Sequence, residues 1–367
     1  MPEPHQRRRA ALRRELRAGG LDGLLVVDLR NIRYLTGFTG SNAALLVYAP
    51  TDSDAGTVLC TDGRYLTQSE REVPDLERVI DRPCDSVLVT LASKRSVHYR
   101  QVGFESQHVT VDRLDALTEA AQSVRLVRRP GLVEKLRMVK DDTEIEALRM
   151  ACAAADRALA ALIEHGGLRA GRTEREVGRD LEDRMLDTGA DGPSFDTIVA
   201  AGVHSAIPHH QPTNTEIQSG DLVKLDFGAV VDGYHSDMTR TFVIGQAAAW
   251  QRDVYQLVRT AQAAGRAALV AGREVAEVDG AARRVIEEAG YGQQYLHNLG
   301  HGVGLEIHEA PSLAKGGRGT LTDGMAVTVE PGVYLAGRGG VRIEDTLVVR
   351  DGAPELLTLT TKDLVVV

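Results

Sequence analysis

The chain has 367 residues, a hydrophobic content of 43% and a formal net charge of −9, which suits two globular domains of ordinary size. The acidic balance argues against a general nucleic-acid binder. The three scattered cysteines, Cys60, Cys84 and Cys152, argue against a disulfide framework and a thiolate metal cluster. They fit a reducing, cytoplasmic location.

The arginine-rich N-terminus predicts a helix over residues 7–17, with Leu12 and Leu16 facing inward and the arginines solvated. The apolar run that follows, at residues 21–27, is too short for a membrane span and lacks a small-residue cleavage site. No other stretch approaches membrane length, so we expect no membrane interaction.

Up to about residue 128, short β-rich segments alternate with helical ones. Strands are expected at residues 24–27, 44–48, 57–60 and 102–105, and further helices at residues 64–72 and 111–121. This alternation predicts a small α/β domain. The run Arg128-Arg129-Pro130-Gly131 is a plausible boundary, which gives two domains, 1–128 and 129–367.

The second domain divides into two similar halves. Capping boxes at residues 143–146 and 173–176 predict a long helix ending at Gly166-Gly167 and another that stops near Gly189. Helices at residues 250–269 and 278–289 repeat the pair. A strand pair follows each helix pair, so we infer an internal duplication with a pseudo-twofold axis. The fold class is therefore α/β (α+β).

Each strand pair carries two acids. In the first, Asp232-Gly233 is a preferred two-residue hairpin turn, and this register makes Asp226 and Asp237 diagonal neighbours on one face. In the second, Glu330 precedes Pro331-Gly332, which ends or bends its strand, and Glu344 lies on the return strand. Acids within apolar strands are costly unless charge compensates them.

The four acids predict a shared metal site together with His301, which glycines flank on both sides. Two divalent cations would neutralise four buried carboxylates. Oxygen ligands with one imidazole favour Mn²⁺, Co²⁺, Fe²⁺ or Zn²⁺, and water between two such ions becomes a nucleophile near neutral pH. The expected chemistry is hydrolysis of a carbonyl or phosphoryl bond.

More histidines surround these five residues in the sequence. His209, His297 and His308 are candidates to bind substrate, stabilise an oxyanion or shuttle protons. His204 and His210 are expected to be exposed to solvent.

The chain resembles the metal-dependent proline peptidases of the pita-bread fold, namely Xaa-Pro aminopeptidase (aminopeptidase P) and Xaa-Pro dipeptidase (prolidase). The resemblance is carried by Asp226-Phe-Gly, Ser236-Asp-Met-Thr-Arg-Thr241, Gly300-His-Gly-Val-Gly304, Glu330-Pro-Gly-Val-Tyr334 and Gly340-Val-Arg-Ile-Glu-Asp345. Residues 31–41 and 61–65 look like a creatinase-type N-terminal domain. The resemblance implies that this domain precedes a catalytic pita-bread domain.

The resemblance also implies roles for individual residues. The metal ligands would be Asp226, Asp237, His301, Glu330 and Glu344, and they would hold two divalent ions, Mn²⁺ before Co²⁺, Zn²⁺ or Fe²⁺. The catalytic and substrate-binding residues would be Glu330, which exchanges protons with a bridging hydroxide, and His209, His297, His308, Tyr334 and Arg342. One departure is His210, where many relatives have Gly.

The leading interpretation is an Xaa-Pro aminopeptidase, a hydrolase that acts on short peptides with proline at position two. The N-terminal segments favour it over the alternative, an Xaa-Pro dipeptidase, which shares the metal site. A non-catalytic pita-bread binding protein and a metal-free, creatinase-like hydrolase are more remote alternatives, because all five ligand positions are filled. The resemblance further implies a homodimer.

Overall fold

The structure is a computed structural model that describes residues 3–95 and 99–367. It divides into two compact units, Met1–Arg137 and Met138–Val367, which are called here the N-terminal and C-terminal domains. The predicted limits, 1–128 and 129–367, stay a prediction. Within the described residues, no helix combines the length and apolar character that crossing a membrane requires.

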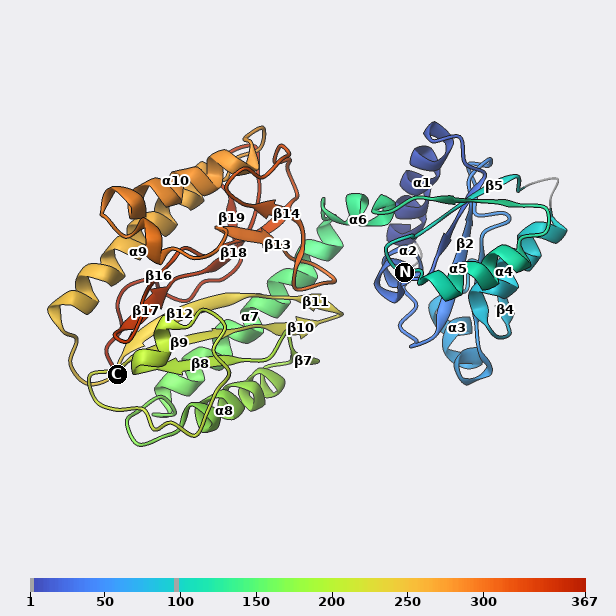
Figure 1. Cartoon of the computed structure of the whole chain (residues 1–367). Coiled ribbons are helices and arrows are strands. Elements are labelled where there is room, and N and C mark those ends of the chain that lie inside the picture. Colours follow the sequence, from blue (N-terminus) through green and yellow to red (C-terminus); the bar gives the residue numbers. More distant parts are fainter. Residues whose placement is uncertain (1–2, 96–98) are drawn as a thin grey trace. The chain divides into compact units, whose positions relative to one another are not determined.

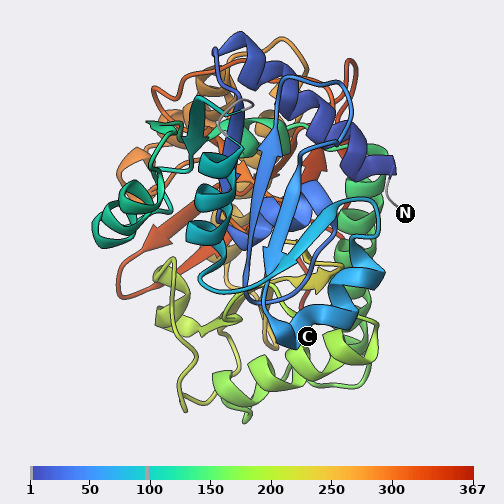
Figure 2. The same cartoon turned by 90° about the vertical axis from the view of Figure 1, so that its right-hand side faces the viewer.

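A six-stranded mixed sheet, ordered β4-β3-β2-β1-β5-β6, forms the centre of the N-terminal domain, and Figure 2 shows its strands side by side. The strands are β1 (Gly23–Val26), β2 (Ala43–Tyr48), β3 (Val58–Thr61), β4 (Glu77–Ile80), β5 (Gln101–Phe104) and β6 (Arg125–Arg128). The helices are α1 (Glu3–Ala18), α2 (Leu29–Thr36), α3 (Leu66–Glu72), α4 (Cys84–Lys94), α5 (Val111–Ala120) and α6 (Leu132–Arg137). The predicted strands and helices are all present within a few residues, whereas β4, β6, α2, α4 and α6 were not predicted.

Helix α1 corrects one expectation. Leu12 and Leu16 are fully buried as predicted, but Arg8, Arg9 and Arg13 are buried as well, and the prediction that the arginines are solvated is wrong for them. Arg9 pairs with Asp54 at 2.7 Å and with Asp75 at 2.5 Å. Burying a guanidinium is tolerable because these carboxylates compensate its charge.

The C-terminal domain contains the two predicted halves, each with a helix pair and antiparallel strands (Figure 1). The helices are α7 (Asp142–Glu164), α8 (Glu174–Asp187), α9 (Ala249–Ala268) and α10 (Val275–Glu288). The first-half strands are β7 (Gly192–Pro193), β8 (Ile198–Ala201), β9 (Leu222–Phe227), β10 (Ala229–Val231), β11 (Tyr234–His235) and β12 (Met238–Val243). The second-half strands are β13 (Gly300–Gly302), β14 (Glu309–Leu313), β15 (Ala326–Val329), β16 (Gly332–Leu335), β17 (Gly339–Arg342), β18 (Asp345–Val348) and β19 (Glu355–Leu356).

Each half has its own apolar core between helices and strands. In the first half, Leu159 of α7 and Leu181 of α8 pack with Val223 and Leu225 of β9. In the second half, α9 and α10 pack against β15 in the same way. Figure 1 shows both helices beside the strands of this half. Because each helix pair covers only one face of its strands, the other strand faces are free to build a site between the two halves.

The starts of α7 and α8 test the predicted capping boxes. The box of α8 is confirmed, since Thr173 caps the N–H of Glu176 and Glu176 bonds back to Thr173. The box of α7 is displaced: Asp141, not Thr143, is the N-cap, and its side chain accepts the N–H of Glu144. A carboxylate at this position satisfies the same free N–H groups that a Thr hydroxyl would.

Candidate metal centre

The first hairpin has the predicted register. Asp232 and Gly233 have φ values of 48° and 71°, as a type I′ turn requires, and Val231 pairs with Tyr234. Beyond this turn, β9 and β12 pair Asp226 with Thr239. Asp226 therefore lies near the end of β9, and Asp237 lies immediately before β12, so both acids belong to one end of the same ladder.

The second half presents its acids at a break between two ladders. Strands β15 and β18 pair Val329 with Asp345, and strands β16 and β17 pair Gly332 with Arg342. Glu330 and Glu344 occupy the interruption, where Pro331 has no N–H to donate to either ladder. The predicted bend after Glu330 is confirmed.

A cavity of about 280 Å³ joins the two halves of the C-terminal domain. Its lining includes all five predicted metal ligands: Asp226, Asp237, His301, Glu330 and Glu344. His209 and His308 line it too. Seven of the ten side chains singled out from the sequence therefore meet around one space, although they come from segments up to 135 residues apart along the chain.

The imidazole of His301 is oriented as a metal ligand would be. Its Nδ1 lies 3.0 Å from the carbonyl oxygen of Gly302, so Nδ1 carries a hydrogen, and in the neutral ring Nε2 presents a lone pair. Nε2 lies 3.5 Å from both Asp237 Oδ2 and Glu330 Oε1. A lone pair facing carboxylate oxygens is unfavourable unless a cation lies among them, and a backbone carbonyl on the other ring nitrogen is the usual support of a ligating histidine.

The electrostatics of the acids also favour a bound cation. Burial raises the pKa of Asp237 well above its ordinary value, and the carboxylates of Asp226 and Glu330 raise it further. Burial, followed by the charge of Asp237, raises the pKa of Glu344 in the same way. Burial also raises the pKa of Glu330. The protein alone therefore does not stabilise four ionised acids here.

Unpartnered oxygens give the direct test of whether a metal fits. Asp226 Oδ1, Asp237 Oδ1 and Glu344 Oε1 are buried and have no hydrogen-bond partner among the described residues. One ligand atom each of Asp237, His301 and Glu344 lies within 4.8 Å of the others. Buried acceptors without donors are rare in native proteins, and a divalent cation would satisfy them. The donor set of oxygens with one imidazole suits Mn²⁺, Fe²⁺, Co²⁺ or Zn²⁺.

The other three predicted residues form a hydrogen-bonded chain that does not line the cavity. Arg342 Nη1 donates to the Tyr334 hydroxyl at 2.8 Å, and that hydroxyl lies 2.8 Å from His297 Nε2. His297 Nδ1 is 2.8 Å from the carbonyl of Asn298, so the tyrosine donates to Nε2. Burial, followed by the charge of Arg342, lowers the pKa of His297 to about 3 and keeps this ring neutral.

Arg342 also orients the acids through hydrogen bonds. Its Nη2 donates to Asp226 Oδ2, and its Nε donates to Thr239 Oγ1 at 2.9 Å. Thr239 in turn donates to Glu344 Oε2 at 2.7 Å. No role was predicted for Thr239 from the sequence, although Thr239 stands in the motif around Asp237 and its pairing opposite Asp226 could have indicated one.

A second cluster contains Glu174, His204 and His210, which could also hold a metal ion. His210 is buried, so the prediction that it is exposed is wrong, and His204 is half-buried. Glu174 Oε1 is 2.9 Å from His204 Nδ1, and Oε2 is 2.9 Å from His210 Nε2. Unlike the acids of the cavity, both oxygens of Glu174 are already hydrogen-bonded, so this cluster is complete without a cation.

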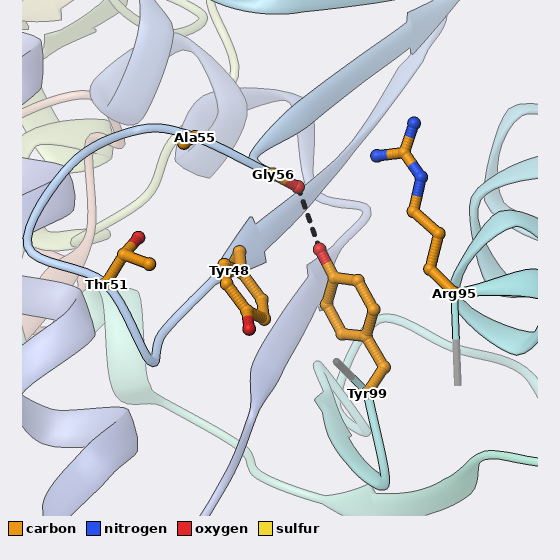
Figure 3. A pocket seen from close by; sticks show the side chains of 6 residues that line it. All are labelled: Tyr48, Thr51, Ala55, Gly56, Arg95 and Tyr99. Atoms are coloured by element: carbon orange, nitrogen blue, oxygen red, sulfur yellow. Dashed lines mark hydrogen bonds between the residues drawn. The ribbon is translucent and has the colours of Figure 1, made fainter. Parts of the chain in front are cut away.

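The N-terminal domain contains a larger cavity of about 440 Å³ beside Tyr48 and Tyr99 (Figure 3). The hydroxyl of Tyr99 donates to the carbonyl of Gly56 at 2.8 Å, and Arg95 pairs with Glu77 at 2.9 Å. Because these polar groups already have partners, the cavity presents mainly aromatic surface. Among the described residues, its lining contains none of the convergent carboxylates and histidines that mark the cavity of the C-terminal domain.

Comparison with known families agrees with the division of the chain into an N-terminal and a C-terminal domain. Residues 146–351 match metallopeptidase family M24, and residues 8–139 match the creatinase/prolidase N-terminal domain. The chain therefore belongs to metallopeptidase family M24, the pita-bread metallopeptidases. It is a metallopeptidase, and the predicted family resemblance and fold class are confirmed.

Individual relatives match along almost their whole length. The chain is 34% identical to the Xaa-Pro dipeptidase of Pyrococcus furiosus over 94% of this chain and 95% of that protein. A solved Xaa-Pro dipeptidase from Bacillus anthracis is 37% identical, with a TM-score of 0.92 and coverage of 99% of this chain and 100% of that chain. The X-Pro aminopeptidase from Thermotoga maritima is 32% identical, with a TM-score of 0.87 and coverage of 96% and 98%.

Proposed function

We propose that the protein hydrolyses the bond between an N-terminal residue and proline, and that dipeptides of the form Xaa-Pro are its main substrates. The observation that carries the hydrolytic assignment is the group of buried carboxylate oxygens without partners around one cavity. The dipeptidases of Pyrococcus furiosus and Bacillus anthracis, which match over nearly the whole chain, support the choice of dipeptides.

The residues proposed to hold two divalent ions are Asp226, Asp237, His301, Glu330 and Glu344. When bound, such ions activate a water molecule and polarise the scissile carbonyl. Mn²⁺ is our first choice, with Co²⁺, Zn²⁺ or Fe²⁺ as alternatives that the same donor set accepts.

The chain's own groups would move the proton and bind the substrate. Glu330, whose pKa burial raises, would take a proton from the attacking water on a carboxylate oxygen and deliver it to the leaving prolyl nitrogen. Burial, followed by the charge of His301, lowers the pKa of His308, so its neutral ring can donate an N–H to the carbonyl oxygen. His209 would bind the substrate from the other half of the cavity.

The bond that is cleaved sets a further requirement. The nitrogen of a prolyl peptide bond has no N–H, so the cavity must accept the ring without demanding a hydrogen bond from it. Phe195, Ile198 and Ile307 supply apolar surface on the cavity wall for this ring.

An Xaa-Pro aminopeptidase, which accepts a chain beyond proline, is the second candidate. A dipeptidase has to recognise the free carboxylate of proline, yet within residues 3–95 and 99–367 the cavity lining includes no Lys or Arg. The N-terminal segments at residues 31–41 and 61–65 also favour the aminopeptidase. If the protein acts on dipeptides, His209 or His308 would bind the free carboxylate of proline.

Substrate length distinguishes the candidates. The metal-free protein is loaded with Mn²⁺, its metal content is measured, and it is given Ala-Pro or Ala-Pro-Ala. We expect rapid release of alanine from Ala-Pro and slow cleavage of the tripeptide. Cleavage of the tripeptide alone would support the aminopeptidase, and loss of both activities in a protein that binds no metal would contradict the whole assignment. Light scattering tests the expected homodimer.

A further inference from the structure

His209 lines the cavity with an exposed ring, but within the described chain no hydrogen bond holds that ring. Its position therefore depends on the backbone that carries it. That backbone belongs to the connection between β8 and β9, which begins with a 3₁₀ turn at Gly202–Ala206. Connections of this kind are the more mobile parts of a domain unless other groups fix them.

Two buried basic side chains fix the backbone before His209. Lys224 Nζ donates to the carbonyl of Ile207 at 2.6 Å and to the carbonyl of Pro208 at 3.0 Å. Arg342 Nη1 donates to the same Pro208 carbonyl at 3.2 Å. Lys224 lies on β9 with Asp226, and Arg342 ends β17 two residues before Glu344, so this side of His209 is tied directly to the candidate metal centre.

Glu174 fixes the backbone after His209. Its Oε2 accepts from His210 Nε2 at 2.9 Å, from the N–H of Thr213 at 2.9 Å and from the Thr213 hydroxyl at 2.7 Å. Its Oε1 accepts from the N–H of Ala201 and from His204 Nδ1, both at 2.9 Å. One fully buried carboxylate thus bonds to both ends of the segment that presents His209.

We propose that Glu174 and His210 are positioning residues for the reaction: they hold His209 at the cavity without touching the substrate themselves. This inference rests on the proposed function for the role of His209. It is supported by the arrangement of the two rings, since His204 and His210 stack with centroids 4.3 Å apart and thereby fix the angle at which His210 meets the carboxylate.

The proposal also explains why a histidine stands at position 210. A glycine at this position would have no side chain to reach Glu174. In this chain the imidazole supplies a third kind of donor to Oε2, beside the backbone and hydroxyl of Thr213. A histidine that was merely exposed beside the cavity would not need this buried partner.

A double-mutant cycle between His209 and His210 tests the proposal. We expect His210→Ala to lower kcat on the cleaved peptide by about tenfold or more, because small displacements of a positioned group cost that much. In a His209→Ala background, adding His210→Ala should change kcat less than twofold, since the residue through which it acts is gone. Equal effects in both backgrounds, or wild-type kcat in the single variant, would overturn the proposal.

Three further variants separate positioning from loss of folding. His210→Gln places an amide nitrogen near the former Nε2 and should restore much of kcat. Thr213→Val removes one donor to Glu174 with little change of volume and should show the same non-additivity with His209→Ala. Asp156→Asn is the matched control, because Asp156 likewise accepts two backbone N–H groups and a hydroxyl, from Leu359 and Thr360; it should leave kcat unchanged.

A crystal structure of the His210→Ala variant gives a readout that does not depend on activity. We expect the His209 ring to be displaced from the cavity while Asp226 and Glu344 keep their positions. An unmoved His209 would overturn the proposal. If the wild-type protein cleaves neither peptide, the proposed function fails, and the position of His209 in this variant still decides whether Glu174 and His210 position it.

Discussion

Thr239 on β12 donates its hydroxyl to Glu344 Oε2 at 2.7 Å, so a strand of the first half orients an acid of the second half. The hydroxyl oxygen of Thr239 in turn accepts from Arg342 Nε at 2.9 Å, and Arg342 Nη2 donates to Asp226 Oδ2. Carboxylates from both halves therefore share one hydrogen-bonded support. Groups of this kind fix the orientation of metal ligands and raise metal affinity.

The first prediction follows from that support. Thr239→Val keeps the volume but removes the hydroxyl, and we expect Mn²⁺ affinity to fall by about 10- to 100-fold, as measured by calorimetric titration of the metal-free protein. Thr241→Val is the control, because the buried hydroxyl of Thr241 donates only to the backbone of Arg342, at 2.9 Å. An equal loss of affinity in both variants would show that Thr239 has no special role.

The buried acids lead to a prediction of opposite effects on stability and metal binding. Because burial raises the pKa of Glu344, its ionised form is unfavourable in the metal-free protein. Glu344→Gln should therefore raise the melting temperature of the metal-free protein at pH 8 while abolishing metal-dependent stabilisation and turnover. Asp237→Asn should behave alike, because burial raises the pKa of Asp237 as well.

Glu355→Gln provides the control for this experiment. Glu355 lies outside the cavity and pairs with Arg350 at 2.5 Å and with Arg149 at 2.6 Å. Its loss should lower the melting temperature slightly and leave metal binding intact. A metal-free Glu344→Gln protein that melts below the wild type would mean that the acids are compensated without a cation.

The acids of the cavity could be predicted from sequence because their positions depend on local rules. The Asp232-Gly233 turn fixed the register of its hairpin. Pro331 marked the break between strands at which Glu330 lines the cavity. Both signals act within a few residues. Asp226 also lies within an apolar strand, and the other three acids lie directly beside one, where a solvated carboxylate is not expected.

The hydrogen-bonded supports could not be predicted because their partners are distant along the chain. Glu174 was recognised only as part of a capping box, yet its partners lie 27 to 39 residues away. Arg9 fitted the polar face of a helix, but its carboxylates lie 45 and 66 residues away. Sequence periodicity reports which face of an element is apolar and does not report which buried polar groups will meet.

His308 should affect turnover rather than metal binding. Its ring packs edge-on against that of His301, with centroids 4.4 Å apart, and lines the cavity. We expect His308→Ala to keep the metal content of the wild type while kcat falls about 100-fold, the loss typical of one missing donor to an oxyanion. His301→Ala should instead lose metal. Metal loss in His308→Ala would make His308 a ligand or a support of one.

The pH dependence of stability should reveal the buried carboxylate of Glu174. Burial raises the pKa of Glu174, but hydrogen bonds from Ala201, His210 and Thr213 outweigh it and hold the pKa at about 2. An unfolded glutamate has a pKa of about 4.3. A depressed pKa stabilises the folded state above the unfolded value, and that contribution is lost as the pH falls from about 4 to about 2.

Urea unfolding of the wild type and of Glu174→Gln at several pH values tests this. The difference in unfolding free energy between the two proteins should be largest at pH 6 and should shrink steadily below pH 4. Asp183→Asn removes an exposed acid from the same helix and serves as the control. A difference between wild type and Glu174→Gln that is the same at pH 6 and pH 3 would contradict the assignment.

Asp196 gives a prediction about recognition of the substrate's amino terminus. It is an exposed acid on the lining of the cavity, and both candidate activities act on peptides with a free, positively charged amine. We expect Asp196→Asn to raise KM for Ala-Pro by about two- to fivefold, the range for a solvent-exposed ion pair, with kcat little changed. High salt should reduce the difference between the two proteins, because salt screens exposed charges.

Two comparisons make the Asp196 experiment specific. N-acetylated Ala-Pro has no charged amine, so wild type and Asp196→Asn should have the same KM for it, even if both cleave it slowly. Asp191→Asn removes a nearby acid that accepts the N–H of Asp232 at 2.9 Å and does not line the cavity, and its KM for Ala-Pro should match that of the wild type. If Asp196→Asn raised KM for the acetylated peptide by the same factor, Asp196 would shape the cavity rather than bind the amine, because the loss would not depend on the charge that it is expected to recognise.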